Sequence, residues 1–109
     1  MESEIEERNS SEESFANKLA KAGETDFYVI SLEDAEKLLT EKRMEIIYVL
    51  KNQEVSSSRE LSRVLDRDIK QVSEDLNLLH EISVIEFKQK GNRKIPQLRH
   101  KNIFIQPVV

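Results

Sequence analysis

Apolar residues recur at helical spacing over two neighbouring stretches in the middle of the chain. In the first, Leu61, Val64 and Leu65 fall at i, i+3 and i+4, which is one face of a helix about two turns long. In the second, the apolar positions follow in steps of three, four and three: Ile69, Val72, Leu76 and Leu79. This pattern predicts two helices joined by a tight turn, the second of them longer and spanning about residues 69–81.

Polar residues at the ends of both stretches match the signals that begin helices. Ser57 followed by Glu60 has capping-box spacing, so the first helix should begin near Arg59, with the glutamate reaching back to the cap. Asp68 is suited to cap the second helix, with Gln71 at the position of its box partner. The sequence therefore predicts a short turn through residues 66–68 between the two helices.

The polar residues of the second helix gather on the side opposite its apolar stripe. At about 100° per residue they cover an arc of roughly 100°, and they are Lys70, Ser73, Glu74, Asn77 and Glu81. A helix pair whose second member carries a polar face near its N-terminus is typical of the helix-turn-helix motif, which places that helix in the DNA major groove. The alternative is a three-helix bundle whose polar face is only solvated.

Upstream of this pair, the pattern predicts four further elements. An amphipathic helix over 15–22 ends at Gly23, and the β-prone run 27–30 indicates an edge strand. Ser31 with Asp34 begins a helix through Leu39, and Thr40 caps a helix over 41–52. Because residues 44 and 46–50 are all apolar, we expect this last helix to be the most buried. Val55 after it is a candidate one-bridge strand.

Downstream, alternation of apolar and charged residues predicts a β-hairpin. VIEFKQ and RKIPQL flank Gly91-Asn92, which favours a tight turn. The apolar run 103–105 predicts a terminal strand that pairs either with the hairpin or with residues 27–30, with Pro96 and Pro107 at its edges.

The hairpin is strongly basic. Between Glu86 and Lys101 there is one acid against six cations, Lys88, Lys90, Arg93, Lys94, Arg99 and Lys101. A basic hairpin after a helix-turn-helix is typical of a wing that reaches phosphates or the minor groove, here over residues 88–94. The alternative is a hairpin that packs on the helices and keeps its lysines in solvent.

Charge is divided unevenly along the chain, whose net charge is −4. Residues 1–36 hold 11 Asp/Glu and 3 Lys/Arg, a net −8, whereas residues 37–109 hold 10 and 14, a net +4. Such asymmetry often marks an acidic tail beside a nucleic-acid-facing domain. Residues 1–14 contain six glutamates and four serines, so we expect them to be disordered.

Composition narrows the classes of function. At 109 residues, 35% of them charged, the chain suits one small domain, and it has no cysteine for disulfides or thiolate metal sites. It shows neither a signal peptide nor an 18-residue apolar run, so we expect a cytoplasmic protein without membrane contact. Its two histidines, His80 and His100, match no catalytic motif, and His80 borders the apolar side of its helix. We expect no enzyme, no cofactor, no metal and no small-molecule ligand.

Three stretches resemble a family of small winged helix-turn-helix DNA-binding regulators found in archaea and bacteria. They are LLTEKRMEIIYVL, SSRELSRVLDRDIKQVSEDLNLL, and an ending with Gly91, Pro96 and NIFI, and the resemblance covers roughly residues 31–106. It implies a transcriptional regulator. In such families the position of Glu74 is often basic, and Ser83 stands where many winged folds place a glycine in left-handed backbone.

Together these patterns predict an α+β fold, a winged helix-turn-helix with a three-helix core and a basic hairpin wing, plus an N-terminal helix and edge strands. We divide the chain into an acidic tail (1–14), an N-terminal helix and strand (15–30) and a DNA-binding domain (31–109). Base contacts are expected from Lys70, Ser73, Glu74 and Asn77, and phosphate contacts from Arg59, Arg63, Gln71, Lys90, Arg93 and Lys94. The partners expected are double-stranded DNA and a second copy of the chain, joined through the N-terminal helix or the terminal strand. The rival hypothesis is a protein-interaction module that docks on a transcription complex.

Overall fold

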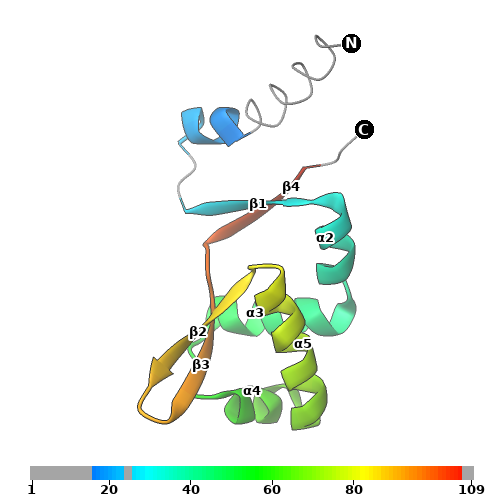
Figure 1. Ribbon diagram of the computed structural model, residues 1–109, viewed down its shortest axis with the longest axis vertical. Helices are drawn as coiled ribbons and strands as arrows, with labels where there is room; N and C mark the ends of the chain where they lie inside the picture. The colour runs from blue at the N-terminus through cyan, green and yellow to red at the C-terminus, as the bar shows by residue number, and fades with distance from the viewer. Residues whose placement is uncertain (1–15, 24–25, 107–109) are drawn as a thin grey trace.

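The structure, a computed structural model, describes residues 16–23 and 26–106. Residues 16–21 are helical and lead to Gly23 at φ +88°, a left-handed conformation that glycine adopts without strain. The predicted disorder of residues 1–14, the first residue of the 15–22 helix and Pro107 lie outside the described residues. The remaining elements run from β1 to β4 (Figure 1).

The helix pair begins at the serine that the sequence indicates. Helix α4 (Ser58–Leu65) has Ser57 as its N-cap, and the Ser57 hydroxyl accepts from the backbone N–H of Glu60 at 3.1 Å. Glu60 reaches back one residue further than expected, because its carboxylate accepts from the backbone N–H and the hydroxyl of Ser56. The helix ends at Asp66, whose φ of 51° is left-handed.

Helix α5 (Ile69–Glu81) follows after a turn of three residues, 66–68. Asp68 stands at its N-cap as predicted, but its side chain makes no capping hydrogen bond. At the other end Ser83 has φ 66°, the left-handed conformation indicated by its place in the sequence. The predicted limits of this longer helix, 69–81, are confirmed.

The two upstream helices also begin at predicted caps. Ser31 caps α2 (Leu32–Leu38) by accepting from the N–H of Asp34, and Thr40 caps α3 (Glu41–Asn52) by accepting from the N–H of Arg43. The expectation that α3 is the most buried helix is wrong. Only Ile46 of α3 is buried, whereas α5 buries Val72, Leu76 and Leu79. Apolar residues on five consecutive positions surround a helix, and the small core covers only one side of α3.

Four strands form two separate two-stranded sheets. β2 (Ile85–Lys90) and β3 (Arg93–Leu98) pair antiparallel around Gly91-Asn92, with Lys90 opposite Arg93. Gly91 at φ 62° supplies the positive φ that a two-residue hairpin turn needs at its first central position. β1 (Phe27–Ser31) and β4 (Asn102–Gln106) pair in parallel, with Val29 opposite Phe104. The terminal strand therefore pairs with residues 27–31 and not with the hairpin.

Three smaller expectations are also corrected. Val55 is buried but forms neither a strand nor a bridge, because its side chain fills the core between α3 and α4 without backbone pairing. Pro96 lies inside β3 opposite Phe87 rather than at the edge of the terminal strand, since a two-stranded ribbon leaves one side of β3 unpaired and needs no N–H there. Val64 and Ile69 are 45% and 38% exposed, although both belong to the apolar stripes.

The core joins all of these elements into one unit. Its buried side chains come from both sheets and all four labelled helices: Ile30, Ala35, Leu38, Ile46, Val55, Leu61, Val72, Leu76, Leu79, Ile82, Val84 and Ile85. In Figure 1 the β1/β4 sheet lies at one end of the molecule, while α4 and the tip of the β2/β3 hairpin lie at the other. The α+β winged helix-turn-helix architecture predicted from the sequence is confirmed.

Candidate nucleic-acid interface

The outer side of α5 is polar and accessible. Lys70, Glu74 and Asn77 are exposed and Ser73 is half-buried, while the opposite side of the helix fills the core. Gln71, placed among the phosphate contacts, is exposed on a different arc of the same helix. Each turn of the outer side thus offers a hydrogen-bonding group that can reach a base edge or a phosphate.

Helix α4 contributes two exposed arginines, Arg59 and Arg63. They flank Glu60, whose pKa is lowered by the hydrogen bonds it accepts from Ser56 and, to a smaller extent, by the positive charges of Arg63 and Arg93. Arg93 belongs to strand β3 of the hairpin, which contacts α4. The basic residues of the two elements therefore share one end of the molecule (Figure 1).

The hairpin turn carries its predicted cations on the surface. Lys90, Arg93 and Lys94 are all exposed, and no carboxylate within the described residues forms a salt bridge with them. Phe87 and Pro96 face each other further down the ribbon, where Pro96 is buried. The base of the hairpin is thus anchored to the core, and its tip presents positive charge to solvent.

A network that the sequence analysis missed holds α5 against the rest of the fold. The Asp75 carboxylate accepts from Arg43 Nε at 3.2 Å and from an Arg67 Nη at 2.7 Å. Nη1 of the same Arg43 guanidinium donates to the backbone carbonyl of Lys37 at 2.6 Å. Asp75 therefore connects α5 to α3, to the end of α2, and to the turn that precedes α5.

This network is largely shielded from water. The Arg67 side chain is only 8% exposed, and its Nε and its second Nη have no hydrogen-bond partner among the described residues. The signal in the sequence is that Asp75 lies within about 65° of the centre of the buried arc of α5, at about 100° per residue. A carboxylate at such a position usually has a buried partner.

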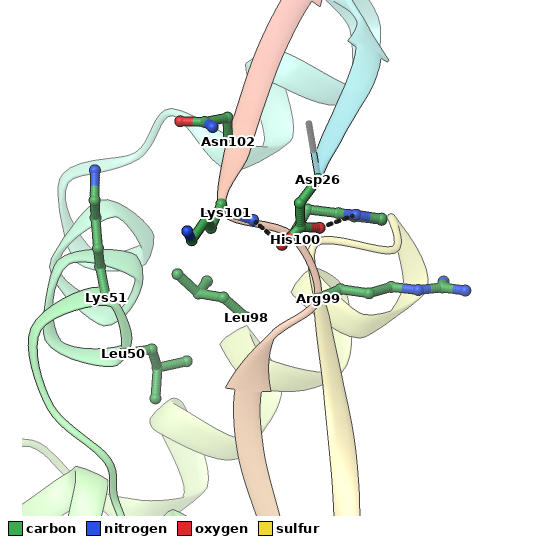
Figure 2. A pocket seen from close by; sticks show the side chains of 8 residues that line it. All are labelled: Asp26, Leu50, Lys51, Leu98, Arg99, His100, Lys101 and Asn102. Atoms are coloured by element: carbon green, nitrogen blue, oxygen red, sulfur yellow. Dashed lines mark hydrogen bonds and ion pairs between the residues drawn. The ribbon is translucent and has the colours of Figure 1, made fainter. Parts of the chain in front are cut away.

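A hollow on the surface lies away from the predicted contacts. It has a volume of about 420 Å³ and lies between the end of α3 and the segment that joins β3 to β4. In Figure 2, Leu50 and Leu98 point into the space beside Lys101, whereas Arg99 points away from it. Asp26 is engaged at its rim, because its carboxylate pairs with His100 at 3.1 Å and accepts from the N–H of Lys101 at 3.2 Å.

Both histidines have packing roles. The His80 ring is exposed but lies 5.3 Å from the Phe87 ring, and the His100 ring stacks on Tyr28 at 5.4 Å. Within residues 16–23 and 26–106, no three acidic, histidine or cysteine side chains group together as metal ligands. In the same part of the chain, none of the helices combines the length and the apolar character that crossing a membrane requires.

Comparison with solved structures identifies the fold. The solution NMR structure of the homodimeric winged helix-turn-helix DNA-binding domain of Mb0332 from Mycobacterium bovis, a possible ArsR-family transcriptional regulator, matches with a TM-score of 0.57. The two sequences are 16% identical, and the match covers 62% of this chain and 62% of that domain. A likeness at this identity establishes the winged helix-turn-helix architecture.

Comparison with sequences identifies the family. No curated protein matches the chain. A family model described only as HVO_A0114 matches residues 38–105, from the end of α2 through most of β4. This segment holds α3, the helix pair and the wing, and it makes up more than half of the 109 residues. The chain therefore belongs to the HVO_A0114 family.

Proposed function

We propose that this protein is a sequence-specific double-stranded DNA-binding transcriptional regulator. The observation that carries the proposal is that α4 and the wing tip, which both carry exposed cations, lie at one end of a winged helix-turn-helix fold whose recognition helix exposes a polar face. Residues 31–109 form the binding unit in this proposal. Cations so placed can neutralise phosphates on either side of the groove that α5 enters.

The residues divide into two roles. Lys70, Ser73, Glu74 and Asn77 contact base edges from α5, where Asn77 can pair with adenine and Glu74 can accept from cytosine N4. The phosphate contacts fix the register of the protein on the duplex without reading sequence. They are Arg59, Arg63, Gln71, Lys90, Arg93 and Lys94, with the wing lying on the backbone or in the minor groove.

The regulator acts as a homodimer in the cytoplasm, where its DNA lies. The Mb0332 domain with the same fold is homodimeric. A twofold protein matches a twofold operator, and two recognition helices bind more tightly than one.

The test measures binding of the full chain to an arbitrary labelled duplex at several salt concentrations. Five cations on phosphates predict a slope of log affinity against log salt near −4 to −5 per bound subunit, at about 0.9 per phosphate. Selection of bound sites from a random duplex library should then return a motif. Absence of duplex binding at 50 mM salt contradicts the proposal.

A second function has its own support. Glu74 places an acid in the middle of the α5 outer side, and elsewhere on the helix pair Val64 and Ile69 are partly exposed apolar residues. These features suit a protein partner better than a phosphate backbone. A winged-helix interaction module would bind a protein of a transcription complex and would not bind duplex DNA.

A further inference from the structure

Helix α3 presents apolar side chains on the side that faces away from the core. Tyr48 is 71% exposed and Met44 is 40% exposed, while Ile46 between them is fully buried. Met44 and Tyr48 are four residues apart and therefore lie on one stripe of the helix. The other described tyrosine, Tyr28, stacks on His100 and packs against the core. Tyr48 therefore differs from Tyr28 in having its ring exposed to solvent.

Charged residues flank this stripe in an ordered way. Glu41 lies at the N-terminal end of α3 and Lys51 at its C-terminal end, and both are exposed. At about 100° per residue, Glu41, Met44, Tyr48 and Lys51 fall within an arc of roughly 80° on the outer side. The helix thus carries an apolar centre between an acidic end and a basic end.

This arrangement is complementary to itself when two copies of α3 run antiparallel. In a register with its twofold axis at the level of residue 46, Met44 lies opposite the partner's Tyr48. The same register sets Glu41 opposite the partner's Lys51. A parallel pair would instead bring like charges together, Glu41 on the partner's Glu41. One antiparallel register therefore satisfies both the apolar and the charged contacts, as a twofold interface requires.

We propose that the homodimer forms through this α3 seam, with Glu41, Met44, Tyr48 and Lys51 as its contacts. The proposal names the interface of the homodimer in the proposed function and rests on that dimer, but it does not depend on DNA binding. It also differs from the two interfaces that the sequence favoured, the N-terminal helix and the terminal strand. All four contacts belong to α3, so neither α5 nor the wing tip contributes a residue to the seam.

The expected dimer is reversible. Twelve residues of helix span about 18 Å, and a seam of this length falls at the low end of specific interfaces, below about 1,200 Å² of total buried area. We therefore expect a dissociation constant in the micromolar range. Tyr48 is its central anchor, because tyrosine combines a large apolar area with few rotatable bonds.

The first experiment is sedimentation velocity of the full chain over a range of concentrations. Tyr48→Arg should raise the dimer dissociation constant at least about tenfold. Its circular dichroism should be unchanged, and so should its melting temperature at concentrations where the wild type is monomeric. The control is Ile105→Arg, which changes a 36% exposed apolar residue on β4 and should leave the dimer intact. Loss of the dimer with Ile105→Arg but not with Tyr48→Arg would place the interface at the terminal strand and overturn the proposal. A monomeric wild type up to about 1 mM would overturn it as well.

The second experiment exchanges the charges. Glu41→Lys alone and Lys51→Glu alone should each weaken self-association, because each creates like-charge pairs at both ends of the seam. An equimolar mixture of the two variants should form a heterodimer of wild-type affinity, since every pair is again of opposite sign. Mixing Glu36→Lys, an exposed acid on α2, with Lys51→Glu is the control and should give no such preference. No recovery in the first mixture contradicts the antiparallel register.

These outcomes separate the seam from the proposed function. A wild-type dimer that loses association with Tyr48→Arg but binds no duplex would keep the seam and remove the DNA-binding function. Duplex binding by a protein that is monomeric at every concentration would do the reverse.

Discussion

At the residue scale, the Asp75 carboxylate accepts hydrogen bonds from two arginines and so connects α5 to α3 and to the turn that precedes α5. Arg67 is almost fully enclosed, so its charge has little access to water when the carboxylate is removed. Asp75→Ala should lower the free energy of unfolding by about 3 kcal/mol, because removing one partner leaves a buried charge uncompensated. Urea denaturation monitored by circular dichroism measures the loss.

The matched control for Asp75 is its neighbour. Glu74 is exposed and forms no salt bridge within the described residues, so Glu74→Ala should change stability by less than about 0.5 kcal/mol. Equal effects of the two substitutions would show that the ion-pair network contributes nothing particular to the fold.

Ser83 holds left-handed backbone immediately after α5, at φ 66°. A residue with a Cβ is strained there by about 1 kcal/mol or more, and glycine relieves this at some cost in unfolded-state entropy. Ser83→Gly should therefore raise the free energy of unfolding by about 0.5 kcal/mol. Ser73→Gly, the same chemical change inside α5, should lower it by a similar amount because glycine disfavours helix. Thermal melts of both variants provide the comparison, and destabilisation by Ser83→Gly would refute the strain.

Asn77 is a residue that we expect to recognise a DNA base. It is exposed on the outer side of α5, where its amide can both donate to and accept from adenine. Asn77→Ala should cost about 1–3 kcal/mol of binding on the preferred site and much less on random duplex. Fluorescence anisotropy on the two duplexes gives both values, and equal losses would remove Asn77 from the specificity residues.

At the scale of elements, the salt dependence of DNA binding tests whether the wing contacts phosphates. Lys90, Arg93 and Lys94 are exposed at the hairpin turn, and the buried base of the ribbon holds them in place. Converting all three to Gln should flatten the slope of log affinity against log salt by about two to three per subunit, at about 0.9 per phosphate. An unchanged slope would mean that the wing lies away from DNA.

A comparison variant tests whether position matters or only total charge. Lys37, Lys42 and Lys101 are exposed cations outside the predicted contacts, and converting them to Gln removes the same charge. This variant should change the slope by less than about one. Equal flattening in both variants would point to general electrostatic attraction rather than a docked wing.

At the scale of the whole molecule, the acidic N-terminal segment is expected to oppose DNA binding. Residues 1–14 carry six glutamates and one arginine, a net −5, so their removal changes the chain from −4 to +1. A flexible tethered polyanion that visits the basic surface competes with phosphate, and salt screens this competition. The truncated protein should bind one duplex more tightly at low salt, with the difference closing as salt rises.

The alternative for this segment is a solvated tail that only aids solubility. Equal affinities at low salt would support that alternative. Weaker binding by the truncated protein would indicate instead that the segment contacts a partner. A variant with the six glutamates changed to Gln separates charge from chain length.

The sequence by itself determined the order of the helices and strands and most of their caps and boundaries. Ser31, Thr40 and Ser57 each accept the backbone hydrogen bond that their spacing predicts, and α5 spans the predicted residues. These features were accessible because a cap, a turn glycine and a hydrophobic period depend on residues within a few positions of one another.

Only the tertiary structure decided which apolar surfaces are covered and which charges meet. Met44 and Tyr48 match the helical pattern of a buried helix, yet they are exposed because the core covers one side of α3. Asp75 meets Arg43, 32 residues away along the chain, and β1 pairs with β4 across more than 70 residues. Such pairings depend on how helices and strands pack in three dimensions, and local sequence patterns carry no record of that packing.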